Sequence, residues 1–484
     1  MNPRTALVTG VTGFVGHRLV PALLEAGWSV RVLTRNPDKL DAAWRDRVEV
    51  VEGDATEPGD VARAVAGADA AYYLLHSMDG RGDFAARDRA LARTFADAAG
   101  AAGVGRMVYL SGLHPAGELS PHLGSRVEVG EILLASGVPT AVLQAGVVLG
   151  AGSASFDMLR HLTERLPAAI GPRWLRNRIQ PIAVDDVIHY LVRAGEVEPP
   201  LNRTVDIGMD EVLSYAAMMR RYAQVVGLWP RHIGTVPVLT PGLASHWVGF
   251  VTPVDSAIAK PLVGSLVHHA VKHEDDAGRL LGDPPGGPAG FDDAVRAATA
   301  GVDPLRWSRT LTRVGAGVVA CALVGGLLSN PDSRWYAALD KPRWQPPATA
   351  FPVVWTGLYG LIAIGATATL ADLHETGQPG RARAFGRALA ANLALNAAWS
   401  GLFFRARNLP LATAGAAVLA ASSTDLARRA AAAGPGKAAA LGAYAAWTGS
   451  ATVLSAAIAR RNRVTPRRPK ESRGGWLRRP TPRR

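Results

Sequence analysis

Five long apolar stretches in the last third of the chain constrain its fold more than any other feature. They lie near residues 311–329, 350–371, 386–404, 409–427 and 438–459, and most charged residues fall between them. Each stretch is close to the roughly 20 residues that a helix needs to cross a bilayer. Their many Ala and Gly residues would let such helices pack closely in lipid. We therefore predict an all-α five-helix transmembrane bundle over residues 309–462, and the alternative is five buried helices of a soluble bundle.

Asp425 is the main exception to the absence of charge inside these stretches. It lies near the end of the fourth one. An acid at such a position is expected to face the interior of the bundle or to lie near the membrane interface.

Residues 1–281 show a different pattern, in which short β-branched runs alternate with helical segments. The strand-like runs are 6–10, 29–34, 48–51, 70–75, 107–110 and 140–143, and the helical segments include 14–26, 84–102 and 125–135. This alternation predicts an α/β Rossmann-type doubly wound parallel sheet that is covered on both faces. Residues 151–280 are less regular and are expected to form a small substrate lobe. Residues 282–308 are predicted to be a Pro/Gly linker and a lead-in to the apolar stretches, with the Pro/Gly-rich part at 282–290.

A glycine-rich segment follows the first predicted strand and opens the first predicted helix. Gly10 permits a tight turn, Gly13 lets the backbone approach a pyrophosphate, and Gly16 allows close contact between helix and strand. The start of the helix also offers free N–H groups and positive potential to a phosphate. The predicted cofactor-binding residues of this segment are Thr9, Gly10, Thr12, Gly13, Phe14, Val15 and Gly16. The alternative is a glycine-rich turn without a ligand.

The residues after the second predicted strand indicate which nicotinamide cofactor is preferred. Folds that prefer NAD place an acid there, on the ribose diol. This chain has Thr34-Arg35-Asn36. Arg35 cannot accept a ribose hydroxyl but suits a 2′-phosphate, so NADP(H) is favoured over NAD(H), although Arg35 could also be a solvated surface residue. Asp54 follows the third predicted strand and is placed either to reach the adenine or to cap a helix.

The segments TGVTGFVG, VEGDATEP, YLSGLHP and QPIAVDDV resemble the extended or atypical short-chain dehydrogenase/reductase family, in its epimerase-like and NmrA-like branch. The resemblance covers about residues 4–280. It implies a catalytic Ser with a Tyr-x-x-x-Lys pair, and here Ser111, His122 and Arg126 fall at those three places. Arginine does not titrate usefully, and histidine is a different acid from tyrosine. Two interpretations remain open: a reductase that uses His122 or direct hydride transfer, and a binder that senses NADP(H).

A histidine cluster at residues 268–274 raises the question of a metal site. His269 and His273 are four residues apart, a spacing that can bind a metal on a helix. His268 and Glu274 lie beside them, but no H-E-x-x-H pattern and no further ligand are evident. We expect a helical surface end here and no metal. The single cysteine of the chain also argues against a disulfide framework or a cysteine-rich zinc module.

The last third of the chain has a second resemblance. WYxxLxKPxWxPP, FPVVWTGLYG, LALNAAWSGLFF and AYAAWTGSATVLSAAIARRN resemble the TspO family of tryptophan-rich sensory proteins, from about residue 309 to 462. That resemblance implies a five-helix membrane bundle that is often dimeric and that binds a porphyrin or haem. The pocket residues that it implies are Trp355, Asn396, Trp399, Tyr444 and Trp447, with Trp335 and Trp344 from a lid. An interfacial aromatic belt is the alternative for these tryptophans. No Lys or Arg follows Tyr444 within five residues, so the weak sterol-binding pattern fails.

The net charge of +13 first suggests a nucleic-acid binder, but its distribution disfavours that partner. Residues 460–484 hold eleven Lys or Arg and one Glu, so they carry +10 of the +13. We predict a basic disordered tail over residues 463–484. The loops on the side of the Rossmann domain hold nine basic residues and the opposite loops hold five, which places that domain in the cytoplasm. The basic tail on the other side contradicts this rule. We still place the Rossmann domain in the cytoplasm, because NADP(H) is supplied there.

These features together predict a multi-pass protein of a bacterial inner membrane. A cytoplasmic NADP(H)-binding oxidoreductase domain would be fused to a TspO-type tetrapyrrole-binding domain. The expected partners are membrane lipid, a tetrapyrrole and a second copy of the chain. The alternatives are a sensor without catalysis and a porphyrin transporter.

Overall fold

The structure is a computed structural model that describes residues 4–75, 83–115, 117, 119–236, 251–254 and 256–462. The chain divides into two compact units, Met1–Arg309 and Thr310–Arg484. The predicted basic tail, residues 463–484, lies outside the described residues. The two units are described separately below.

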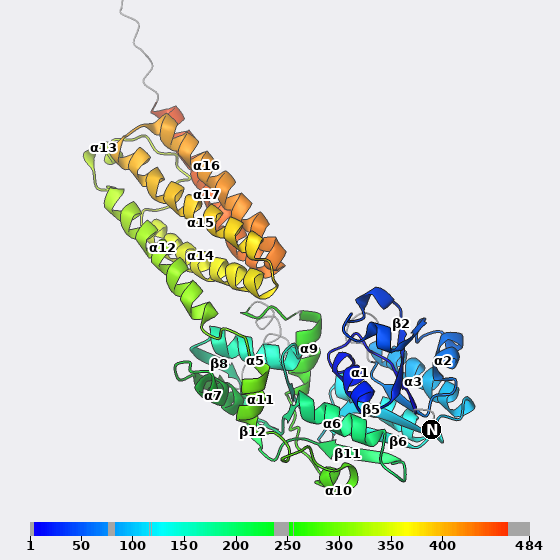
Figure 1. Ribbon diagram of the computed structural model, residues 1–484. Coiled ribbons are helices and arrows are strands. Elements are labelled where there is room, and N and C mark those ends of the chain that lie inside the picture. Colours follow the sequence, from blue (N-terminus) through cyan, green and yellow to red (C-terminus); the bar gives the residue numbers. More distant parts are fainter. Residues whose placement is uncertain are drawn as a thin grey trace, which may run out of the picture. The chain divides into compact units, whose positions relative to one another are not determined.

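The first unit is built on a seven-stranded sheet with the order β11-β6-β5-β4-β1-β2-β3 (Figure 1). All of its strand pairs are parallel. The strands are β1 (Thr5–Val8), β2 (Ser29–Thr34), β3 (Glu49–Glu52), β4 (Ala70–Tyr73), β5 (Arg106–Gly112), β6 (Thr140–Ala145) and β11 (Arg203–Ile207). The strand order changes direction at β1, between β2 and β4. Ligands of open parallel sheets bind at the carboxyl ends of the strands beside such a switch point.

Helices cover both faces of this sheet, as the strand–helix alternation predicts. On one face lie α1 (Gly16–Glu25) and α6 (Val184–Ala194), and on the other lie α2 (Pro58–Val65), α3 (Phe84–Ala101) and α4 (Pro121–Leu134). Successive residues of β1 alternate between the two cores: Val8 packs with α1, and Leu7 packs on the opposite face. This is the period of two that a strand requires. The prediction of a doubly wound parallel sheet is confirmed.

A smaller lobe follows the sixth strand and has its own hydrophobic core. Its helices are α5 (Ala154–Arg165), α7 (Tyr215–Val225), α9 (Ser256–Ser265) and α11 (Phe291–Ala298). The short helix α10 (Ala277–Leu281) instead buries Ala277 and Leu281 in the core of the sheet, on the face of α1 and α6. Its short strands are β7 (Val148–Leu149), β8 (Ala168–Pro172), β9 (Arg178–Ile179), β10 (Ile182–Ala183), β12 (Leu213–Ser214) and β13 (His232–Val236). Phe156 of α5 and Tyr222 of α7 are fully buried in this core.

The predicted linker and lead-in, residues 282–308, include a helix of the smaller lobe. This helix is α11, whose Phe291, Ala294, Val295 and Ala298 are all buried in the core of the lobe. Their spacing of three and four residues places them on one face of the helix. The Pro/Gly-rich composition describes only the residues before α11.

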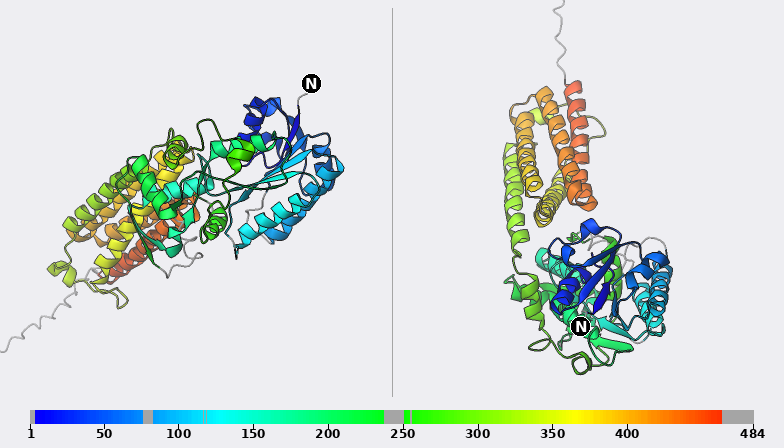
Figure 2. Two further views of the ribbon diagram at one scale, coloured as in Figure 1. Left: turned by 90° about the horizontal axis from the view of Figure 1, so that it is seen from below. Right: turned by 45° about the vertical axis from the view of Figure 1, so that its right-hand side comes forward.

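The second unit contains five long helices and one short one. The long helices are α12 (Arg306–Leu328), α14 (Ala350–Glu375), α15 (Pro379–Ser400), α16 (Leu409–Ala430) and α17 (Pro435–Arg461), and they lie side by side in both views of Figure 2. The short helix α13 (Arg334–Ala337) precedes α14. A π-helical turn, Gly401–Arg405, follows α15.

Among the described residues, three helical segments are long and apolar enough to cross a membrane. They are Arg306–Leu328, Ala350–Glu375 and Leu409–Ala433. The first turns of α15 contain Arg381, Arg383 and Arg387, and α17 is rich in Ala and Gly. These compositions lower the hydropathy of both helices. A long helix therefore lies at each of the five predicted stretches, and three of these helices have the composition of a membrane span; five spans stay a prediction.

The core of the second unit contains a buried ion pair. Lys437 Nζ of α17 lies 2.6 Å from Asp372 Oδ2 of α14, and the two side chains are only 6% and 2% exposed. Lys437 also donates to the carbonyl of Ala433 at 2.8 Å. Asp425 takes a different environment: its side chain is 31% exposed and pairs with Arg428 and Arg429 at the end of α16. Of the two positions expected for Asp425, the bundle interior is therefore wrong.

Candidate functional site

The glycine loop connects β1 to α1 beside the switch point of the sheet. Gly10 has φ +67°, and a Cβ there would lie 2.4 Å from the carbonyl oxygen of Leu74. A Cβ at Gly16 would lie 2.5 Å from the carbonyl oxygen of Gly10. Both positions therefore require glycine for the fold itself. Thr9 fixes the same loop, because its buried hydroxyl donates to the carbonyl of Tyr72 and accepts the N–H of Leu74.

Gly13 differs from these two glycines because its open side faces solvent. Thr12 and Gly13 are exposed. A Cβ at Gly13 would meet only the carbonyl oxygen of Gly10, at 3.1 Å. The first turn of α1 contains no acidic residue. This helix N-terminus can therefore accept a phosphate close to the backbone, since its free N–H groups favour an anion.

The residues after β2 and β3 lie near each other. The Arg35 guanidinium is 80% exposed and lies 3.9 Å from Asp54 Oδ2. Asp54 Oδ1 accepts the N–H of Thr56 at 3.0 Å, which closes a turn, while α2 begins after Glu57. Asp54 therefore caps a turn, and the expected role as a helix N-cap is wrong. Its expected contact with adenine stays a prediction. An exposed guanidinium at this place can still meet a 2′-phosphate.

A cavity of about 310 Å³ joins the glycine loop to the candidate catalytic residues. It is lined by Gly10, Gly13, Phe14, Val15 and Gly16 together with Ser111, His122 and Arg126. Ser111 lies on β5, and the other two lie on α4. The structure therefore brings together, in one cavity, residues that lie roughly a hundred positions apart in the sequence.

Hydrogen bonds connect two of the candidate catalytic residues, Ser111 and Arg126, to each other and to β5. The Ser111 hydroxyl donates to the carbonyl of Arg126 at 3.4 Å, and the Arg126 guanidinium donates to the carbonyl of Leu110 at 2.5 Å. Arg126 Nε is buried and has no hydrogen-bond partner within the described residues. Burial, together with the charge of Arg126, lowers the pKa of His122 to about 4. His122 is therefore neutral near pH 7, where it can still donate or accept one hydrogen bond.

The opposite end of the cavity is formed by the smaller lobe and is mostly apolar. Its lining residues include Met158 of α5, Tyr215 of α7, Leu262 and Leu266 near α9, and Ala270. None of these was a predicted site residue. They carry no local motif, and only the packing of the lobe on the sheet brings them to the cavity.

The histidine cluster does not form a helix or gather around one point. The helix α9 ends at Ser265, so the expected helical surface end is wrong. His269 Nδ1 accepts the N–H of Arg178 at 2.9 Å, His273 lies beside Asp206 at 3.5 Å, and Glu274 pairs with Arg203. Each residue is therefore used in a separate contact.

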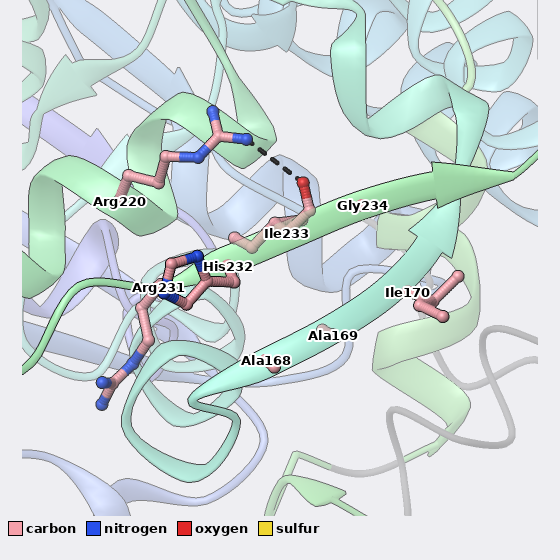
Figure 3. Close-up of a pocket in the computed structure, with 8 residues that line it drawn as sticks. All are labelled: Ala168, Ala169, Ile170, Arg220, Arg231, His232, Ile233 and Gly234. Carbon is pink, nitrogen blue, oxygen red and sulfur yellow. Dashed lines mark hydrogen bonds between the residues drawn. The ribbon is translucent and has the colours of Figure 1, made fainter.

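A further hollow, of about 600 Å³, lies along β8 and β13 (Figure 3). The Arg220 guanidinium donates to the carbonyl of Ile233 at 3.2 Å there. No residue of the glycine loop and none of the catalytic candidates lines it. The cavity at the glycine loop is therefore the better candidate site of the first unit.

In the second unit, three of the expected tetrapyrrole-pocket residues lie together. Asn396 Nδ2 donates to the Tyr444 hydroxyl at 2.9 Å, and the rings of Trp355 and Tyr444 are 6.4 Å apart. The Tyr444 hydroxyl in turn donates to Asn392 at 3.0 Å, and Tyr359 donates to Asn396 at 3.3 Å. Asn392 and Tyr359 were not predicted. The signal for Asn392 was its spacing of four residues before Asn396, which places both amides on one helical face.

Of the other expected pocket residues, Trp447 packs against the same bundle core, and Trp399, Trp335 and Trp344 lie elsewhere. Trp399 stacks on Phe403 at 5.3 Å and donates its Nε1–H to the carbonyl of Ala412 at 3.0 Å. Trp335 also packs on Phe403, at 5.7 Å. The ring of Trp447 lies 6.1 Å from that of Phe351, and Trp344 is 56% exposed. The structure therefore divides the predicted set between the bundle core and a second aromatic cluster around Phe403.

Two family profiles match separate parts of the chain. The NAD(P)H-binding profile matches residues 10–139, and the TspO/MBR family profile matches residues 314–461. The first match includes the glycine loop and Arg35. The second includes the aromatic residues of the helical unit.

Individual proteins are similar to one part or the other. A tryptophan-rich sensory protein of Cereibacter sphaeroides is 40% identical over 110 residues, which are 23% of this chain and 63% of that protein. A ceramide reductase of Caulobacter vibrioides is 30% identical over 237 residues, which are 47% of this chain and 72% of that protein. The solved structure of a nucleoside-diphosphate-sugar epimerase from Staphylococcus aureus is 14% identical with a TM-score of 0.50, and the match covers 60% of this chain and 99% of that chain. The chain thus spans less than two thirds of the sensory protein.

Proposed function

We propose that this chain is a membrane-anchored NADP(H)-dependent oxidoreductase fused to a tetrapyrrole-binding helical domain. Its N-terminal part belongs to the NAD(P)H-binding reductases, and its C-terminal part belongs to the TspO/MBR family. The observation that carries the proposal is the shared cavity. It connects the glycine loop to Ser111, His122 and Arg126 and then to an apolar lobe.

The glycine loop and Arg35 are the residues that would hold the cofactor. The exposed backbone at Gly13 and the start of α1 fit a pyrophosphate, since a side chain at Gly13 would occupy that approach. Arg35, with its 80% exposed guanidinium, would pair with the 2′-phosphate. When bound, NADPH supplies a hydride to the substrate.

The polar side chains of the cavity would orient and stabilise a substrate oxygen. Arg126 carries a fixed positive charge, which favours negative charge that develops on such an oxygen. The neutral imidazole of His122 can donate one hydrogen bond to it. With a pKa of about 4, His122 is not protonated at neutral pH and is a poor general acid. We therefore assign it the role of orienting the substrate oxygen.

The substrate that fits this site is an apolar molecule with a reducible carbonyl or quinone group. The lining of the lobe is apolar, and the similar Caulobacter protein is a ceramide reductase. Substrates of this kind partition into membranes. A reductase that is anchored by the helices of the second unit would therefore meet them at the bilayer surface.

The test is the consumption of NADPH by the full-length protein in detergent or in nanodiscs. Quinones and long-chain ketones would be offered as substrates, with Gly13→Ala as the control whose cofactor binding is weakened. We expect oxidation of NADPH that depends on substrate and that requires a higher NADPH concentration in the control. No turnover with either class in the wild type would contradict the proposed reductase.

The missing Tyr-x-x-x-Lys pair favours one second candidate, a sensor. In a sensor, the binding of NADP(H) to the first unit would change the affinity of the second unit for a porphyrin. Linkage requires the effect to be reciprocal. Protoporphyrin would be titrated into the full-length protein with and without NADPH, and equal affinities would exclude this candidate.

We also propose that the first unit faces the cytoplasm, where NADPH is available. The count of basic residues in the loops, without the tail, supports this orientation. Lys437, one of the nine basic residues on that side, is buried and paired with Asp372, so its charge is neutralised. The remaining eight still exceed the five on the opposite side.

A further inference from the structure

Tyr215 is a buried residue of the cavity that the proposed function has not used. It is the first residue of α7, it is 2% exposed, and it lines the cavity at the apolar end. Its hydroxyl oxygen is buried and has no hydrogen-bond partner in the described part of the chain.

This hydroxyl differs from three of the serine hydroxyls of the same cavity. Ser111 donates to the carbonyl of Arg126, Ser153 donates to the carbonyl of Val148 at 2.8 Å, and Ser265 donates to the carbonyl of Pro261 at 3.1 Å. Each serine therefore satisfies its own O–H by a backbone carbonyl. A buried donor without a partner costs free energy that a phenylalanine would avoid. The tyrosine is therefore best explained by a partner that arrives with a ligand.

The surroundings of Tyr215 limit the kind of ligand. Met158, Leu262 and Leu266 also line this part of the cavity, and they offer no polar side chain. Burial raises the pKa of Tyr215 well above that of an exposed tyrosine, so the hydroxyl stays protonated and acts as a donor. A ligand that fits both features has apolar flanks and one hydrogen-bond acceptor.

We propose that the apolar end of the cavity binds a carbonyl-bearing apolar molecule and that the Tyr215 hydroxyl donates a hydrogen bond to its oxygen. This inference rests on the proposed reductase function and names the substrate class of the same site. It also makes Tyr215 a determinant of specificity. A site built to donate a hydrogen bond rejects an analogue that lacks the acceptor, because the buried donor then stays unpaired.

The experiment compares two probes of the same shape. Menadione carries two carbonyl oxygens, and 2-methylnaphthalene has the same ring system and methyl group without them. Equilibrium binding of each probe would be measured with the full-length protein in the presence of NADP⁺, which cannot donate a hydride. We expect the wild type to bind the quinone about 10- to 100-fold more tightly than the hydrocarbon, and Tyr215→Phe to lose most of this preference.

Tyr222→Phe is the matched control. Tyr222 lies on the same helix and is fully buried, but its hydroxyl donates to Glu164 at 2.7 Å, and Tyr222 does not line the cavity. We expect Tyr222→Phe to lower the melting temperature and to keep the preference for the quinone. Tyr215→Phe should keep or raise the melting temperature, because it removes an unpaired donor.

The inference is overturned if Tyr215→Phe keeps the preference for the quinone, since the hydroxyl would then be only an unpaired group of the core. It is also overturned if the wild type does not bind the quinone more tightly than the hydrocarbon. Because binding is measured with NADP⁺, a protein that shows the preference without any NADPH turnover would contradict the reductase and leave the assignment of Tyr215 intact.

Discussion

Replacement of Gly13 by alanine should separate the binding of NADPH from the stability of the fold. The two neighbouring glycines cannot be used for this purpose. An added Cβ at Gly10 or Gly16 would lie 2.4 or 2.5 Å from a backbone oxygen. At Gly13 the nearest such atom is 3.1 Å away, which requires a shift of only a few tenths of an ångström.

The structure allows the size of each effect to be estimated. The smaller entropy of the unfolded chain favours the alanine variant by about 0.4–1 kcal/mol, which offsets part of the close contact. We therefore expect the free energy of unfolding to change by less than about 1 kcal/mol. The new methyl group would stand between the loop and the pyrophosphate. Loss of one hydrogen bond from a backbone N–H to a charged phosphate is worth about 1.5–3 kcal/mol, which is roughly a 10- to 100-fold loss of affinity.

The assay is a fluorescence titration of the full-length protein with NADPH, together with a melting curve. Gly59→Ala is the matched control, since Gly59 lies in the first turn of α2 and a Cβ there would meet nothing within 4 Å. The control should bind NADPH as the wild type does. The reasoning is refuted if Gly13→Ala binds NADPH with wild-type affinity. A simultaneous loss of porphyrin binding would show that the two halves of the chain are not independent.

Three further substitutions test other parts of the structure. Arg35→Ser should lower the affinity for NADPH about 10- to 100-fold, because the ion pair with the 2′-phosphate is lost, and should leave the affinity for NADH nearly unchanged. Titrations with both cofactors measure this. An unchanged ratio of the NADPH affinity to the NADH affinity would count against the role of Arg35 at the 2′-phosphate. The pKa of His122 is about 4 in the folded protein, below the roughly 6.5 of an unfolded histidine. Between these two pH values the unfolded state binds more protons than the folded state, so the free energy of unfolding falls as the pH drops through this window. His122→Gln should remove that part of the loss in melting curves recorded against pH, and parallel curves for both proteins would contradict the assignment. Lys437→Met should destabilise the helical unit by about 3–5 kcal/mol because Asp372 loses its buried cation, whereas Lys437→Met with Asp372→Leu should recover most of the melting temperature in detergent.

The parts of the fold that local patterns control were predictable from the sequence. The strand–helix alternation predicted the parallel sheet, and the glycine loop predicted the link between β1 and α1. The helix α11, which has eight residues, was not predicted within the segment after the Pro/Gly linker. Its Phe291 is buried by the core of the lobe, which is formed by residues far away in the chain. Composition near residue 282 carries no information about that distant surface.

The candidate site shows the same division. The motif positions Ser111, His122 and Arg126 do line the cavity of the glycine loop. Tyr215 could not be predicted, because α7 reaches the cavity only through packing of the lobe. In the helical unit, the tryptophan motifs did not reveal that Trp399 would stack on Phe403. That contact is made where the chain passes from α15 into the π-helical turn Gly401–Arg405.

The ion pair between Asp372 and Lys437 also has a consequence for biosynthesis. A ribosome makes α14 well before α17, so the carboxylate emerges long before the ammonium group that neutralises it. During that interval the acid must stay hydrated, because a lone buried charge is costly. Closure of the helical unit around α14 should therefore wait for α17. A nascent chain that is stopped before Lys437 should expose α14 to proteolysis, and the completed chain should protect it.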